Sequence, residues 1–291
     1  MNFSKDTNGK MPQVVDKMSG EIRSSLFWRA CLAEYIATLF FVFLGLASTV
    51  TFGDEIPDLL KISLAFGLGI ATLVHCTAHI SGGHLNPAVT IAFLVTHQIT
   101  PLKAILYILA QVLGGISASG ILFGLTTGSN WETGTRYGVT APQVGVMEYQ
   151  ALFVEMLLTF QLVFTVFSTV DPDRKGFTGS GPLAIGLSVA LGHFAAIRIT
   201  GASMNPARTL ASAVISGNYT AHWVYWVGPI LGGIIAASLY DMVLAPTATP
   251  SRIRKCISCE YDVTDDDVSP GDIDLSMINH GHTADETGGK I

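Results

Sequence analysis

The tripeptide Asn-Pro-Ala occurs twice in the chain, at Asn86-Pro87-Ala88 and at Asn205-Pro206-Ala207. Asparagine is a favoured N-cap, because its side-chain oxygen accepts a hydrogen bond from a backbone N–H of the first helical turn. Proline suits the first helical position, where no N–H is needed. Each motif therefore predicts a helix start with a free asparagine NH2 group beside about half a positive charge. Two such starts facing each other would donate hydrogen bonds to an oxygen atom and repel cations.

The surroundings of the two motifs also repeat. His79–Thr90 and Arg198–Thr209 are identical at half of their aligned positions, including the whole Asn-Pro-Ala motif. A Glu-x-x-x-Thr pattern lies upstream of each motif, and a Leu-Gly-Gly triplet lies downstream of each. These markers are Glu34 with Thr38, Glu155 with Thr159, Leu113–Gly115 and Leu231–Gly233. Because they recur in the same order at nearly constant spacing, we predict an internal repeat.

The elements that carry these motifs are apolar. Of the 291 residues, 49% are hydrophobic and only 13% are charged, about half the usual charged fraction of a soluble domain. A helix of roughly 20 apolar residues crosses a bilayer core. Six stretches are long enough, and they lie near Trp28–Thr51, Leu60–Ala78, Leu102–Leu125, Met147–Val170, Leu183–Ile199 and His222–Leu244. The sequence therefore predicts a helical membrane protein with several spans.

The spans divide equally between the two copies of the repeat. Since each copy has an odd number of spans, the second copy enters the membrane from the opposite side, which makes an inverted repeat. The helices predicted at 87–98 and 206–216 are too short to cross, because 12 residues reach only about 18 Å of a core about 30 Å thick. Irregular backbone at that depth is tolerated where it lines a watery cavity. The two motifs are thus expected to meet beside a pore at the middle of the membrane.

The predicted fold is an all-α polytopic membrane protein, with six transmembrane helices and two re-entrant half-helices in an inverted repeat. Its expected parts are a tail 1–26, a first repeat 27–126, an outer loop 127–146, a second repeat 147–245 and a disordered tail 246–291. Lys and Arg concentrate in alternate loops and in both tails, so both termini are expected in the cytoplasm. Asn218 then begins an N-glycosylation sequon on the outer side.

These motifs resemble those of the major intrinsic protein (aquaporin) family, and the similarity extends from Phe27 to Leu244. The resemblance implies a passive, water-selective channel of the plasma membrane, a homotetramer with one pore in each subunit, without a cofactor. It also implies an outer filter, whose four positions fall on Phe66, His193, Ala202 and Arg208. In aquaporin-type pores, half-helix dipoles and such an arginine generally exclude protons and cations.

Two other functions stay open on these residues. Glycerol-conducting relatives typically have glycine at the position of His193 and aspartate at that of Thr209, so a facilitator of glycerol or other small neutral solutes is the less favoured reading. A junctional membrane protein is a second alternative, although the predicted outer loops are short. An enzyme is not expected, because no catalytic arrangement of side chains fits the topology. No basic stripe suggests nucleic acid, so the expected surroundings are water and membrane lipid.

Two carboxylates fall inside predicted spans. Glu34 and Glu155 occupy equivalent positions of the two copies, and a charged side chain at the membrane centre costs about 3 kcal/mol on insertion scales. A proton relay is one interpretation. Their symmetric placement favours another, in which each carboxylate accepts hydrogen bonds from backbone N–H groups of a pore loop. His84 is expected to join this support of the first loop.

Overall fold

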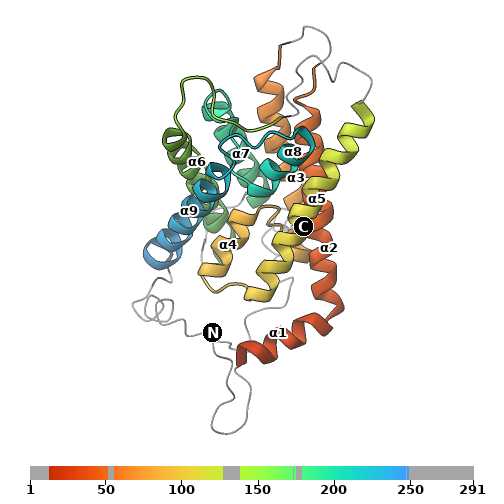
Figure 1. The fold of residues 1–291 in the computed structure, drawn as a ribbon. Helices are drawn as coiled ribbons and strands as arrows, with labels where there is room; N and C mark the ends of the chain where they lie inside the picture. Colours follow the sequence, from red (N-terminus) through yellow and green to blue (C-terminus); the bar gives the residue numbers. More distant parts are fainter. Residues whose placement is uncertain are drawn as a thin grey trace, which may run out of the picture.

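The computed structural model describes residues 13–51, 56–126, 138–172, 174, 179–246 and 248, with side chains from Lys17 onward. All regular structure in these ranges is helical (Figure 1). The helices are α1 (Gln13–Arg23), α2 (Ser25–Ala47), α3 (Leu59–Ser81), α4 (Pro87–Val95), α5 (Pro101–Thr126), α6 (Glu148–Val170), α7 (Gly181–Ala196), α8 (Pro206–Ser216), α9 (Val224–Leu239) and the π-helical η2 (Tyr240–Leu244). Much of the tail predicted at 246–291 and of the loop predicted at 127–146 lies outside the described residues.

The helices form two equivalent sets, α2 to α5 and α6 to α9. Within each set the first helix packs along the last, α2 on α5 and α6 on α9. Each half-helix also packs against the last helix of the other set, α8 on α5 and α4 on α9. In Figure 1, α4 lies in the half of the bundle nearer α1, and α8 lies in the opposite half. We refer to these two sides as the α1 end and the far end.

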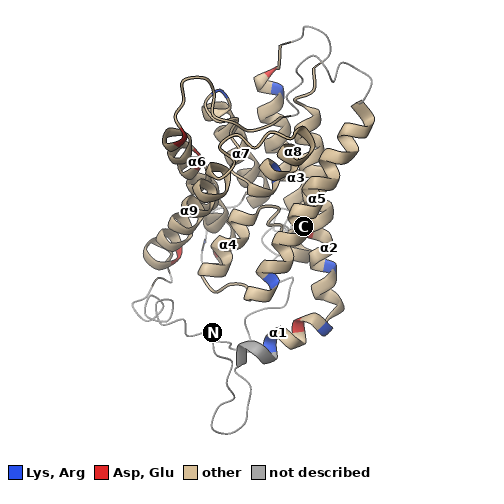
Figure 2. Cartoon of the chain, viewed as in Figure 1, with Lys and Arg blue, Asp and Glu red and all other residues tan. Residues whose placement is uncertain are grey.

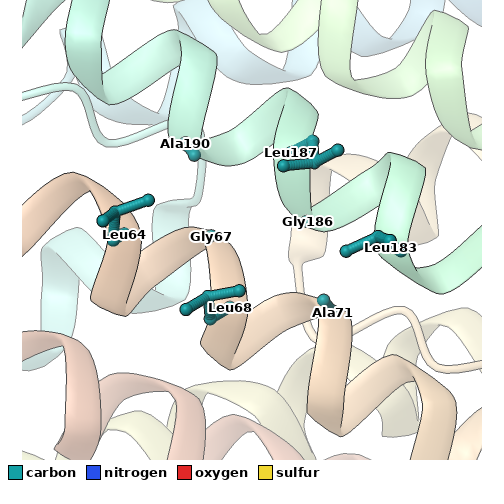
Figure 3. A pocket seen from close by; sticks show the side chains of 8 residues that line it. All are labelled: Leu64, Gly67, Leu68, Ala71, Leu183, Gly186, Leu187 and Ala190. Atoms are coloured by element: carbon teal, nitrogen blue, oxygen red, sulfur yellow. The ribbon is translucent and has the colours of Figure 1, made fainter.

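The seam between the two sets is the crossing of α3 and α7. Gly67 and Gly186 lie at this crossing, and a side chain on either one would overlap the backbone of the other helix. Leucines of both helices stand beside the glycines and border a shallow hollow (Figure 3). Leu68 is 53% exposed and Leu187 is 55% exposed. The outer surface of the α3–α7 crossing is therefore apolar.

Five helices in the described ranges are long and apolar enough to cross a membrane, namely α2, α3, α5, α6 and α9 with η2. The sixth predicted span is α7, an apolar helix of 16 residues. It begins at Gly181, N-capped by the hydroxyl of Ser180, and it ends where the chain turns toward the second Asn-Pro-Ala motif. The first half-helix is shorter than the predicted 87–98. It stops at Val95 because His97 adopts a left-handed backbone with φ of 60°.

The region predicted as the tail 1–26 contains the helix α1 and the first residues of α2. The helix α1 lies across the end of the bundle that also contains α4 (Figure 1). The hydroxyl of Thr100, next to the start of α5, donates a 2.6 Å hydrogen bond to the carboxyl of Glu21. Partial burial raises the pKa of this carboxyl above its ordinary value, although the Thr100 bond and nearby lysines act in the opposite direction. Lys and Arg gather on α1 and the adjoining starts of α2 and α5 (Figure 2).

Replacing Gly232 by alanine should reduce the amount of folded protein. Gly232 of α9 lies against the carbonyl of Met156 in α6, so an added methyl group forces the two helices apart. Overpacking of this kind typically costs about 1–3 kcal/mol. The matched control is Gly120→Ala on α5, where nothing lies within 4 Å of the added methyl, and where alanine favours the helix by roughly 1 kcal/mol. Thermal unfolding in detergent, followed by size-exclusion chromatography, should separate the two variants, and equal stability would contradict the packing argument.

Candidate functional site

The two Asn-Pro-Ala motifs start half-helices in the predicted way. The side-chain oxygen of Asn86 accepts a 2.9 Å hydrogen bond from the backbone N–H of Ala88 at the start of α4. That of Asn205 accepts from Ala207 and Arg208, at 3.0 and 3.2 Å, at the start of α8. Both prolines occupy the beginning of their helices. The two N-termini meet inside the protein, since each asparagine is only 3% exposed.

Each asparagine is also bonded to the loop of the other repeat. Asn86 Nδ2 donates a 2.7 Å hydrogen bond to the carbonyl of Met204, and Asn205 Nδ2 donates a 2.8 Å bond to the carbonyl of Leu85. Leu85 and Met204 have left-handed backbones, with φ of 52° and 54°. The prediction that both amide hydrogens would be free was therefore wrong, because one hydrogen of each group holds the opposite loop. The other remains for a ligand.

The two buried carboxylates hold the loops that precede the asparagines. Glu34 accepts hydrogen bonds from the backbone N–H groups of His84 and Leu85, at 2.9 and 2.8 Å. Glu155 accepts from those of Ser203 and Met204, at 2.9 and 2.8 Å. Each also accepts a hydroxyl bond, from Ser81 in the first repeat and Thr200 in the second. Both carboxylates are fully buried. The geometry is that of a brace for a pore loop.

His84 lies two residues before the first asparagine, in a compact polar and aromatic group. Its Nδ1 lies 3.1 Å from the hydroxyl of Thr90. That hydroxyl donates to the carbonyl of Asn86, so the ring must be the donor of the pair. The ring stacks on Phe93 with centroids 4.6 Å apart and meets Tyr107 edge-on. His84 is thus fixed to α4 and α5, next to the first loop.

Three of the four residues expected in an outer filter come together in the half of the protein that contains α8. Phe66 of α3 stacks on His193 of α7, with centroids 4.5 Å apart. The guanidinium of Arg208 lies over the Phe66 ring, 5.0 Å from its centroid. The fourth residue, Ala202, is fully buried in the loop before Asn205 and has a left-handed φ of 50°. All four side chains are buried, so only a small molecule could contact them.

Two polar atoms of this group have no partner in the described part of the chain. They are His193 Nε2 and Arg208 Nε, both buried. The other ring nitrogen of His193 lies 2.9 Å from the carbonyl of Val189, which can only accept. A neutral His193 therefore carries its proton on Nδ1 and offers Nε2 as an acceptor, while Arg208 offers a donor. A molecule that both donates and accepts hydrogen bonds would satisfy both atoms.

Several residues of this site were missed in the sequence. Tyr107 and Tyr225 donate their hydroxyls to the carbonyls of Ser81 and Thr200, at 2.8 and 2.7 Å. They recur at the same spacing as the Leu-Gly-Gly triplets, so the repeat could have identified them. Gln111 bonds both Glu34 and Thr90 from α5, at 2.8 and 2.9 Å. Its signal was a polar side chain in an apolar span.

The predicted glycosylation residue lies away from this site. Asn218 follows the end of α8 at Gly217 and is exposed. Its side-chain oxygen accepts a 3.0 Å hydrogen bond from the backbone N–H of Thr220, so the sequon forms a compact turn. The structure therefore places this side chain at the surface of the far end.

Comparison with known proteins agrees with the geometry. The model of the major intrinsic protein family matches residues 21–240. Aquaporin-4 of Mus musculus is 50% identical over 79% of this chain and 71% of its own length. Aquaporin-1 of Homo sapiens is 45% identical over 87% of this chain and 97% of its own length.

A solved structure is similar as well. The X-ray structure of the aquaglyceroporin from Plasmodium falciparum superposes with a TM-score of 0.67 at 26% identity, covering 75% of this chain and 97% of that one. With two half-helices meeting at crossed asparagines and this degree of similarity in sequence and fold, the chain belongs to the major intrinsic protein family.

Proposed function

We propose that this water-selective channel controls passage at two of the sites described above, the crossed asparagines and the group of Phe66, His193 and Arg208. The chain is a channel and not an enzyme, in line with its membrane-spanning helices and its aquaporin relatives. The observation that carries the proposal is the pair of reciprocal bonds from Asn86 and Asn205 to the opposite loops. These bonds fix the remaining amide hydrogens side by side, where both half-helices begin.

At the asparagines a water molecule turns its oxygen inward. The remaining N–H of each amide donates to that oxygen, and the two helix termini add a positive potential of about half a charge each. A water held in this way keeps its hydrogens pointing outward toward both ends of the pore. It cannot pass a proton along a continuous chain, and a cation meets repulsion.

At the outer filter the same molecule meets complementary groups. His193 Nε2 accepts a hydrogen bond, Arg208 donates one, and Phe66 closes the remaining side with an apolar ring. Ala202 adds a small wall. A solute larger than water would have to displace these packed side chains, and a cation would face the guanidinium charge without its hydration shell. Glu34, Glu155 and His84 hold the backbone that carries these groups.

The test is osmotic. In stopped-flow light scattering, proteoliposomes should shrink rapidly when mixed with a sucrose gradient, because water leaves through the channel. A glycerol gradient should produce the same rapid shrinkage, and the vesicles should not re-swell on the time scale of water movement. The reason is that the four filter side chains are closely packed and almost fully buried, so a three-carbon solute would have to displace them. Vesicles without protein provide the background. Re-swelling in glycerol at a rate near that of water entry would reverse the assignment in favour of a glycerol facilitator.

The assembly and placement rest on the family resemblance and on surface chemistry. The chain is proposed to form a homotetramer with one pore in each subunit, in the plasma membrane. The exposed leucines of the α3 and α7 seam offer an apolar surface for lipid or for neighbouring subunits. The cations at the α1 end support cytoplasmic termini, and Asn218 then faces outward as a glycosylation site. Native mass spectrometry would give the subunit number, and glycosidase treatment would test Asn218.

A further inference from the structure

The segment Gly138–Gln143, which precedes α6, lies against the loop that carries the outer filter. The carbonyl of Gly138 accepts a hydrogen bond from Arg208 Nη1. The backbone N–H of Gln143 donates a 2.9 Å bond to the carbonyl of Ile199. Between these two points, the hydroxyl of Thr140 lies 2.8 Å from that of Thr209 in α8. This segment, far from the motifs in sequence, is thus bonded to Ile199 before the loop and to Thr209 and Arg208 of α8 after it.

The loop under this segment has an unfavourable backbone. Gly201, Ala202 and Met204 all have left-handed φ values, of 86°, 50° and 54°. For a residue with a Cβ, such as Ala202 or Met204, this conformation is unfavourable, and it persists where its surroundings determine it. Thr140 is 4% exposed and packs on Gly201, where an added Cβ would lie 3.1 Å from the threonine methyl. Thr140 therefore contacts the loop at Gly201, next to the strained backbone of Ala202.

The hydroxyl groups of Thr140, Thr209 and Ser203 form a chain of hydrogen bonds, and the donor of each bond in it can be assigned. Ser203 Oγ donates a 2.9 Å bond to the carbonyl of Asn205, which uses its only hydrogen. Ser203 must then accept from Thr209, and Thr209, having used its own hydrogen, must accept from Thr140. Thr140 is the donor that completes a chain ending on the backbone of the pore asparagine.

In the first repeat, Thr90 occupies the position equivalent to Thr209, but its hydrogen-bond donor comes from a different element. Thr90 donates to the carbonyl of Asn86 and accepts a 2.9 Å bond from Gln111 Nε2 of α5. By the spacing of the Leu-Gly-Gly triplets, the position of Gln111 corresponds to Pro229 of α9. Proline has no side-chain donor, so this position of α9 cannot supply the bond. In the second repeat the donor comes from Thr140 instead.

We propose that Thr140 is a positioning residue that sets the selectivity of the outer filter by holding Thr209 and the loop 200–204. This inference rests on the proposed filter of Phe66, His193 and Arg208. Without the hydroxyl, the loop relaxes, Arg208 loses its alignment with the Phe66 ring, and the filter admits larger uncharged solutes. Water still passes, because the crossed asparagines are unaffected.

The test compares Thr140→Val, which keeps the shape and removes the donor, with Thr140→Ser, which keeps the donor. The measured quantity is the ratio of glycerol to water permeability in proteoliposomes. After the permeabilities of protein-free vesicles are subtracted, loss of folded protein lowers both channel permeabilities equally and leaves this ratio unchanged. Thr140→Val should raise the ratio roughly fivefold, the factor that one net hydrogen bond typically contributes. Thr140→Ser should match the wild type, as should the control Thr165→Val, which removes a hydroxyl that donates to the backbone carbonyl of Gln161 in its own helix.

Other outcomes overturn the inference. An unchanged ratio in Thr140→Val, or an equal rise in Thr140→Ser, would show that the hydroxyl does not position the filter. If Thr140→Val does not fold, Thr140→Ala takes its place. If neither folds while Thr140→Ser does, Thr140 serves folding and not selectivity. A wild type that passes glycerol as fast as water would instead contradict the proposed filter itself, a result visible before any variant is made.

Discussion

Replacing Arg208 by valine should raise the glycerol-to-water permeability ratio at least tenfold and produce a measurable proton flux. The guanidinium lies 5.0 Å from the Phe66 centroid and is 3% exposed, so its removal opens space in the filter and removes a buried charge. Two unit charges about 4 Å apart repel by about 4 kcal/mol at an effective dielectric constant of about 20, which corresponds to roughly a thousandfold in rate. The positive half-helix termini remain, so the proton flux should stay well below that bound.

Two further variants separate charge from shape in this experiment. Arg208→Lys keeps the positive charge and should still exclude protons, while its flexible ammonium group admits more glycerol than the planar guanidinium does. Arg198→Val removes an exposed arginine outside the filter and should change neither flux. Proton entry is followed with a pH-sensitive dye inside the vesicles. If Arg208→Val excluded protons and glycerol as the wild type does, Arg208 would have no role in selection.

Replacing Glu155 by glutamine should mainly reduce the amount of folded channel. The carboxylate accepts three hydrogen bonds, from Thr200, Ser203 and Met204, using both oxygens. Glutamine retains one accepting oxygen, so at least one buried backbone N–H loses its partner at a cost of about 1–3 kcal/mol. This is a large part of a total stability of about 5–15 kcal/mol. The monodisperse fraction after purification should fall, while the water permeability per folded channel stays near that of the wild type.

The control for this variant is Glu148→Gln. Glu148 is an exposed glutamate at the start of α6 that accepts a hydrogen bond from the indole of Trp223. Its replacement leaves no buried group unpaired, so folding should be unchanged. A Glu155→Gln channel that folds normally and conducts protons would support a proton relay and refute the structural role.

The sequence was most informative where the two repeats agree. Identical motifs at constant spacing predicted both half-helices and the equivalence of Glu34 with Glu155. The second half-helix was predicted at 206–216, the range that α8 occupies. The first was predicted three residues too long, because no propensity shows that His97 takes a left-handed backbone after Val95.

The sequence was least informative about contacts between a repeat and a residue that lies outside that repeat. Thr140 lies between the repeats and has no counterpart, so only its proximity to Thr209 reveals a contact. The crossed amide bonds also escaped prediction, because a capping motif shows where the asparagine oxygen bonds but not where its NH2 group points. The helix α1 precedes the repeat and had no second copy to support it.

The hydrogen bonds of Asn86 and Asn205 are self-complementary, because the asparagine of each repeat donates to a loop carbonyl of the other repeat. Such reciprocity is the defining property of an isologous twofold dimer. A half-length ancestor of about one repeat could have made the same contacts with a second copy of itself, at a strength that depended on its concentration. Joining the two copies in one polypeptide removes that dependence, so that a single translated chain closes its own pore however few molecules the membrane holds.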